Sequence, residues 1–153
     1  MTVGNYCERK LALLTRDASL QDAAMMMRHY HVGEVIVVDK LDGKNIPVGV
    51  VTDRDFVIKI MALDVDVDVD VDQISVGHIM SVELITVGED YSLSDALDVM
   101  QQHGVRRLPV VDSNGILSGL IDMEIILKIL CQDLGKMLAL INTERNIEKC
   151  LRS

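Results

Sequence analysis

A hydroxyl and a carboxylate stand three residues apart in the segment Gly-Val-Val-Thr-Asp-Arg-Asp at 49–55. The apolar run over 46–51 predicts a strand that ends at Thr52, and the apolar spacing over 53–63 predicts a helix. A strand that leads directly into a helix leaves free backbone N–H groups at the start of the helix, which favour an anionic ligand. Thr52 and Asp55 at this junction can together offer a hydroxyl and a carboxylate to a sugar diol.

The same two residues also fit a purely structural capping box. In that interpretation the Thr52 hydroxyl accepts a hydrogen bond from the backbone N–H near Asp55, and the Asp55 carboxylate reaches back to the start of the helix. The local pattern leaves both interpretations open.

The composition limits the classes of partner. The chain has 153 residues, enough for one domain or for two small units that share a core, and 49% of them are hydrophobic. Its net charge of −9 and its aromatic content of 3% argue against a nucleic acid, which requires basic surface and stacking platforms. An anionic membrane surface is disfavoured for the same electrostatic reason. A small anion is compatible with this charge where basic side chains are concentrated at one place.

The sequence also indicates a compartment. No apolar run approaches the length that spans a bilayer, and the run at 11–14 is too short for the apolar core of a signal peptide. The cysteines, Cys7, Cys131 and Cys150, are odd in number and lack CxxC spacing. We therefore expect a cytoplasmic protein with reduced thiols and no membrane segment.

Two copies of one pattern follow each other along the chain. Six residues of the first copy recur 73 positions later: Leu20, Asp22, Ala23, Met27, Val32 and Asp39 return as Leu93, Asp95, Ala96, Met100, Val105 and Asp112. Each copy predicts a short strand, a helix after a Ser-x-x-Asp cap, two strands around a turn, and a second helix. The paired strands are expected at 34–38 and 47–51 in the first copy, and at 107–111 and 116–121 in the second.

A unit of this kind leaves one face of its sheet uncovered, and two units packed together bury both faces. We therefore expect an α/β (α+β) fold in which two β-α-β-β-α repeats pack about a pseudo-twofold axis, with two equivalent clefts between them. The expected boundaries are 1–63 for the first repeat, 64–76 for an acidic linker, 77–128 for the second repeat and 129–153 for a C-terminal helical extension.

The linker and the tail lie outside the repeated pattern. The alternation of Asp and Val over 64–72 predicts an extended linker or an exposed edge strand, whose carboxylates are spread too far apart for a calcium or magnesium cage. In the tail, five apolar residues keep helical spacing: Leu130, Leu134, Met137, Leu138 and Ile141. The tail helix either covers the module's own surface or meets the same helix of a second chain, and we expect the second arrangement, a homodimer.

With both copies in view, the chain resembles a tandem pair of CBS domains, often called a Bateman module. The resemblance rests on Ser-Leu-x-Asp-Ala at 19–23 and 92–96, His-Gly-Val-Arg-Arg-Leu-Pro-Val-Val-Asp at 103–112, the segment at 49–55, and Ile79-Met80 ahead of the second copy. It covers about residues 11–129. The chain looks most like the small stand-alone members, because no catalytic or transport sequence accompanies the pair.

The resemblance implies a regulatory module that binds an adenosine-containing ligand, such as AMP, ADP, ATP or S-adenosylmethionine, in a cleft between the repeats. By resemblance, Thr52 and Asp55 hold the ribose hydroxyls, and Arg54 faces the cleft between them. The chemistry agrees, since a carboxylate can accept hydrogen bonds from both ribose hydroxyls.

The remaining site residues implied by the resemblance come from the second copy. Arg106 and Arg107 match positions that reach the phosphates, and Ile85 and Thr86 match positions that line the adenine pocket. The planar arginine fork fits phosphate oxygens. The alternative interpretation of the two arginines is a surface pair that forms ion pairs with the acidic linker.

The second copy departs from the pattern at the positions that would bind ribose. Its threonine position holds Asp122 and its carboxylate position holds Ile125, which cannot accept a hydrogen bond. On the mirror side, the two arginine positions hold Gly33 and Glu34. We therefore predict one nucleotide site per chain, with the twin cleft empty or holding an uncharged molecule.

The other candidate groups do not support chemistry. His29 and His31 diverge at the end of a predicted helix, where an imidazole suits the helix C-terminus better than a metal. The sequence shows no P-loop, no GxGxxG and no credible catalytic triad. We expect no enzyme, no catalytic residue, no metal and no resident cofactor. The nucleotide would shift the angle between repeats or chains and signal to an unidentified protein. A constitutive assembly scaffold and an S-adenosylmethionine sensor stay open as alternatives.

Overall fold

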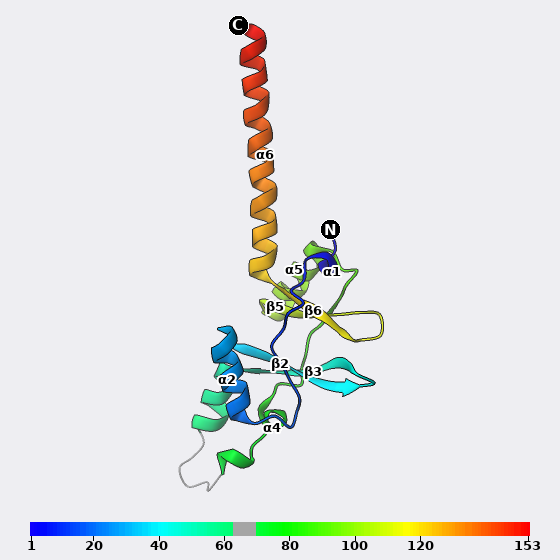
Figure 1. Cartoon of the computed structure of the whole chain (residues 1–153), viewed down its shortest axis with the longest axis vertical. Coiled ribbons are helices and arrows are strands. Elements are labelled where there is room, and N and C mark those ends of the chain that lie inside the picture. The colour runs from blue at the N-terminus through cyan, green and yellow to red at the C-terminus, as the bar shows by residue number, and fades with distance from the viewer. Residues whose placement is uncertain (63–69) are drawn as a thin grey trace.

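Each sequence repeat folds into its own three-stranded sheet. The computed structural model describes residues 1–62 and 70–153 and is shown in Figure 1; most of the Asp-Val alternation lies outside the described residues. The first sheet contains β1 (Leu13–Leu14), β2 (Glu34–Leu41) and β3 (Lys44–Thr52), and the second contains β4 (Val87–Gly88), β5 (Arg107–Val111) and β6 (Leu117–Asp122). In both sheets the first two strands are parallel and the last two antiparallel. The predicted α/β (α+β) fold of two repeats is confirmed.

A capping box starts the first helix of each repeat, as the Ser-x-x-Asp pattern predicts. At α2 (Leu20–Tyr30), the Asp22 backbone N–H donates to the Ser19 hydroxyl, and the Ser19 N–H donates to the Asp22 carboxylate. Ser92 and Asp95 repeat this arrangement at α5 (Leu93–His103). The apolar stripe predicted for each helix is buried at three of its four positions, Leu20, Ala23 and Met27 in α2 and Leu93, Ala96 and Met100 in α5. Of the other two predicted positions, Ala24 is exposed and Leu97 is partly buried.

The short helices that precede each repeat are exchanged between the repeats. In α1 (Val3–Tyr6), the Gly4 N–H donates to the Glu89 carbonyl at 2.9 Å, and Val3 lies in the hydrophobic cluster of the second repeat. In α4 (Val76–Ile79), the Gly77 N–H donates to the Arg16 carbonyl at 2.9 Å, and Val76 lies in the cluster of the first repeat. The hydrophobic cores therefore cross the boundaries that the sequence repeat suggests, and the exchange joins the two repeats into one unit.

The chain that follows each exchanged helix crosses the opposite sheet at a glycine. Beside Gly49, Val50 and Ser81 exchange two backbone hydrogen bonds of 3.0 and 2.8 Å. Beside Gly119, Glu8 and Leu120 exchange two of 2.8 and 2.9 Å. The segment after Ser81 continues into residues that line a cleft between the repeats. Gly49 therefore helps to position one side of that cleft.

The helices that close the two repeats differ in length. After β3, the helix α3 (Asp53–Asp55) continues as the π-helix η1 (Phe56–Met61), and the 3-10 helix η2 (Val71–Gln73) follows the segment that is not described. After β6, a single helix α6 (Met123–Arg152) runs for 30 residues and projects away from both sheets (Figure 1). The predicted tail helix is present, but it continues the closing helix of the second repeat without a break at 128/129. No helix in the described ranges combines the length and apolar character needed to cross a membrane.

Candidate functional site

Two clefts lie between the repeats, one beside each strand-to-helix junction. The Thr52 cleft is lined by the end of β3 and the turn after it (52–54), the start of β5 and the residues before it (105–107), and the segment ahead of β4 (83–85). Its volume is about 510 Å³, within the usual range for a small-molecule site. The site is therefore built from both repeats.

The structure brings five of the seven predicted site residues to the Thr52 cleft: Thr52, Arg54, Ile85, Arg106 and Arg107. Asp55 and Thr86 are not among the lining residues. Three carboxylates line the cleft in addition: Glu34, Asp53 and Glu83. Asp53 was not predicted as a site residue, although it lies on the same turn as Thr52. The family resemblance implied the carboxylate three positions after the threonine instead.

The Asp55 carboxylate is occupied by the protein itself. Its Oδ2 accepts from the Thr52 backbone N–H at 2.8 Å and from the Thr52 hydroxyl at 3.1 Å, and the Asp55 N–H donates to that hydroxyl at 3.2 Å. Its Oδ1 forms an ion pair of 3.0 Å with Lys59, whose ammonium also donates to the Ile79 carbonyl. The capping-box interpretation is confirmed, whereas the ribose contact of Asp55 stays a prediction.

Three guanidinium groups and three carboxylates balance the charge of the Thr52 cleft. The guanidiniums of Arg54, Arg106 and Arg107 are the groups suited to phosphate, because each presents a planar fork of donors. Burial raises the pKa of Glu34, and the nearby positive charge of Arg107 partly offsets that effect.

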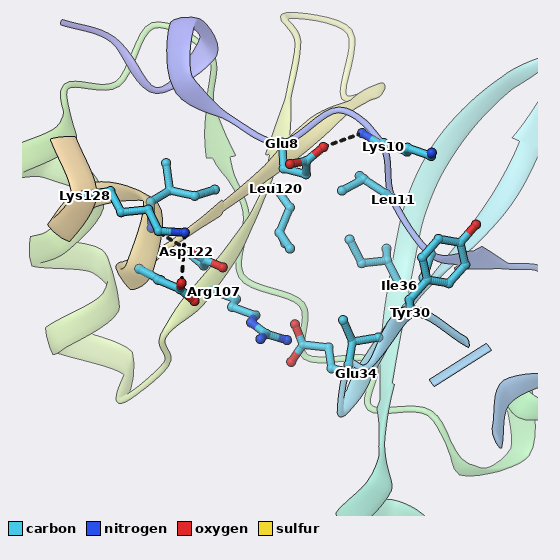
Figure 2. Close-up of a pocket in the computed structure, with 14 residues that line it drawn as sticks. Glu8, Lys10, Leu11, Tyr30, Glu34, Ile36, Arg107, Leu120, Asp122 and Lys128 are labelled. Atoms are coloured by element: carbon cyan, nitrogen blue, oxygen red, sulfur yellow. Dashed lines mark hydrogen bonds and ion pairs between the residues drawn. The ribbon is translucent and has the colours of Figure 1, made fainter. Parts of the chain in front are cut away.

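Glu34 and Arg107 occupy equivalent positions in the two repeats and line both clefts. Each begins the first long strand of its repeat, β2 or β5. Figure 2 shows their side chains pointing toward each other across the space between the sheets. A ligand that attracts Arg107 in one cleft therefore also changes the charge that the other cleft presents.

The twin Asp122 cleft, shown in Figure 2, has a volume of about 330 Å³ and carries charges of both signs. Asp122 caps α6 by accepting from the Ile125 N–H at 2.7 Å, and Glu124 pairs with Lys128 at 2.9 Å. Lys10 also lines this cleft, and sequence reasoning overlooked both lysines because neither falls in the repeated pattern. Ile125 lines the cleft where a ribose acceptor would be needed.

The described residues contain no group of three or more His, Cys, Asp or Glu side chains that could hold a metal ion. The ring of His29 packs edge-on against Tyr30, with the ring centres 4.9 Å apart. Burial raises the pKa of the Cys7 thiol, which disfavours the thiolate that a nucleophile requires.

Comparison with known proteins supplies the family. The family model described as "CBS domain" matches residues 3–62 and 76–132. An uncharacterized protein of Methanopyrus kandleri is 34% identical over 129 residues, which are 84% of this chain and 62% of that relative, so the chain spans less than two thirds of the relative's length. A candidate signal-transduction protein with CBS domains from Burkholderia ambifaria is 27% identical, with a TM-score of 0.71 over 87% of this chain and 96% of that one. The CBS domain pair of the protein MJ0100, solved with 5′-methylthioadenosine and S-adenosyl-L-methionine, shares the fold at 21% identity, with a TM-score of 0.69 over 87% of this chain and 98% of that one.

Proposed function

The chain belongs to the CBS-domain family, a family of regulatory modules, and from that premise we propose that it is a non-enzymatic sensor that binds AMP, ADP or ATP in the Thr52 cleft. The observation that carries the proposal is the convergence of three arginines from two repeats, Arg54 from one and Arg106 and Arg107 from the other, on the cleft that holds the Thr52 hydroxyl. Arginine forks of this kind suit phosphate oxygens, and a hydroxyl beside a carboxylate suits a ribose.

Each group has a distinct part in this proposal. Arg106 and Arg107 bind the phosphates, Arg54 closes the cleft from the opposite repeat, and Ile85 packs against the adenine, with Thr86 beside it. The ribose hydroxyls would contact Thr52 together with either Asp53, which lines the cleft, or Asp55, whose carboxylate is part of the capping box. The twin cleft lacks an equivalent acceptor at Ile125, so the proposal keeps one nucleotide per chain.

The signal follows from the shared position of Arg107. A phosphate in the Thr52 cleft attracts Arg107 away from Glu34 and favours one arrangement of the two repeats over another. We expect the sensor to act as a homodimer in the cytoplasm, where adenine nucleotides are abundant and a partner protein would receive the conformational change. Catalysis has no part in this scheme.

S-adenosylmethionine is the second candidate ligand, because the CBS pair of MJ0100 shares the fold and was solved with that molecule. The carboxylates Glu34, Asp53 and Glu83 of the Thr52 cleft could pair with the positive groups of such a ligand. This candidate predicts that binding depends on the carboxylates more than on the arginines.

Calorimetric titration with AMP, ADP, ATP, adenosine and S-adenosylmethionine separates these candidates. Arg107→Ala removes one charge-assisted hydrogen bond, which is worth about 1.5–3 kcal/mol. The variant should therefore bind AMP roughly 10- to 150-fold more weakly than the wild type, and its affinity for adenosine should be unchanged. Arg145→Ala, on the exposed part of α6, is the matched control and should bind AMP normally. Asp53→Asn and Asp55→Asn then identify the ribose acceptor.

Three results would contradict the proposal. If no titration gives heat, the chain is a scaffold without a ligand. If Arg107→Ala weakens adenosine as much as AMP, the phosphate assignment is wrong. If only S-adenosylmethionine binds, the protein is a sensor of that molecule and not of an adenine nucleotide.

A further inference from the structure

The long helix α6 carries an apolar stripe that its own chain leaves exposed. Leu127, Leu130, Leu134, Met137 and Ile141 expose 56%, 46%, 59%, 62% and 44% of their surface. The buried residues of α6 are Ile126 and Ile129, both near the start of the helix where it meets the second repeat. The rest of the helix projects away from the sheets (Figure 1). Most of the stability of a protein helix comes from packing of its apolar face, so a partner on this stripe would stabilise α6.

The spacing of the stripe specifies the kind of partner. Its five residues alternate steps of three and four, which is the pattern of the two core positions in a coiled-coil heptad. Such a seam accepts the side chains of another helix rather than a flat surface or a small ligand. The last four residues, Leu130, Leu134, Met137 and Ile141, follow steps of four, three and four, which read the same from either end. A second copy of α6 therefore matches it when the two helices run in opposite directions.

The charges beyond the stripe decide the direction of that second copy. Glu144 and Glu148 occupy the next two core positions after Ile141. In a parallel pair, each of these glutamates would face its own equivalent, and like charges would meet in the seam. In an antiparallel pair, both glutamates move to the ends of the apolar seam and no longer face each other.

We propose that α6 pairs with α6 of a second copy of this chain in an antiparallel arrangement centred between Leu134 and Met137. Leu134 then lies opposite Met137 of the second copy, and Leu130 lies opposite Ile141. In the same register Lys149 lies within one turn of Glu124 of the second copy, and Glu144 and Glu148 lie level with its Leu127 and Met123, at the two ends of the seam. This inference specifies the surface of the homodimer proposed above and does not depend on nucleotide binding.

The mass of the full chain in solution tests the surface. Analytical ultracentrifugation should give twice the 17.0 kDa of one chain, and Leu134→Asp should give the mass of a single chain. Gln132→Asp places the same charge on the exposed opposite face of α6 and should leave the dimer intact. If Leu134→Asp remains dimeric, the homodimer is right and the surface is wrong. A monomeric wild-type chain would overturn both.

Cross-linking tests the direction. The native cysteines Cys7, Cys131 and Cys150 are first replaced by serine, and Leu130→Cys and Ile141→Cys are then introduced separately. An antiparallel pair predicts rapid disulfide formation only when the two variants are mixed, because Leu130 faces Ile141 of the second copy. Cross-linking of each variant with itself would indicate a parallel pair and overturn the proposed direction. An absence of cross-links in every sample would overturn the seam.

Discussion

Adding one methyl group at Gly49 should destabilise the protein. A Cβ built there would lie 2.7 Å from the Ser81 carbonyl oxygen and 2.8 Å from the Met80 Sδ, closer than non-bonded carbon contacts allow. The neighbouring Val50 and Ser81 are held by two backbone hydrogen bonds of 3.0 and 2.8 Å, so the crossing segment cannot move without losing them. Overpacking of this kind costs about 1–3 kcal/mol, which corresponds to a fall in Tm of roughly 2–12 °C for a chain of this size.

The assay is thermal unfolding followed by circular dichroism, with every variant at the same protein concentration because a dimer's Tm depends on concentration. Gly135→Ala is the matched control, since a Cβ there meets no atom within 4 Å and the residue lies inside α6. Alanine is the better helix former by about 1 kcal/mol, so this variant should unfold at a higher temperature than the wild type. The same substitution therefore has opposite expected signs at the two glycines.

The consequence for binding follows from the path of the chain. The segment displaced by Gly49→Ala continues into Glu83, Leu84 and Ile85, which line the Thr52 cleft. Affinity for AMP should therefore fall in Gly49→Ala and stay unchanged in Gly135→Ala. A Gly49→Ala protein that unfolds at or above the wild-type temperature would refute the steric argument, because the crossing would then have room for a side chain.

Two further predictions concern a titrating group and a cap. Burial raises the pKa of Glu34 in the folded state above its value in the unfolded state. The free energy of unfolding therefore falls as the pH rises from the unfolded pKa through the folded pKa. Glu34→Gln should then be more stable than the wild type at neutral pH and lose this advantage in acid. Urea unfolding at pH 4 and pH 7 measures the difference. An equal gain in stability at both pH values would contradict the role of Glu34 ionisation. Ser92→Ala removes the hydroxyl that accepts from the Asp95 N–H and should cost about 1 kcal/mol in urea unfolding, while Ser92→Asp should retain most of that stability; an unchanged Ser92→Ala would show that the cap adds nothing.

Local chemistry was sufficient to predict the elements of each repeat. The strand at 107–111 has the predicted bounds, and the helices after Ser19 and Ser92 begin where their caps indicate. These features depend on neighbours within a few residues, such as a side chain that accepts from the third N–H of its own helix. The repeat itself then indicated the two sheets, because one exposed sheet face requires another to cover it.

The exchanged helices could have been found in the sequence but were not. Val3-Gly4 recurs as Val76-Gly77 at the same 73-residue offset as the rest of the repeat. The match is only two residues long, so it carries little weight until the structure places both glycines against equivalent carbonyls, those of Glu89 and Arg16. A short match gains meaning only when long-range contacts support it.

The sequence by itself determined the repeat, its secondary structure and the residue types available at each junction, because these follow from side-chain chemistry and from periodicity along the chain. Only the tertiary structure decided which groups share a cleft. In the folded chain Asp53 lines the Thr52 cleft, and the Asp55 carboxylate binds Thr52 and Lys59. Glu34 lies opposite Arg107 between the two clefts. The physical reason is that the direction of a carboxylate depends on which donors the folded chain brings within hydrogen-bond distance, and donors such as Lys59 are identified only once the helix beyond the junction has formed.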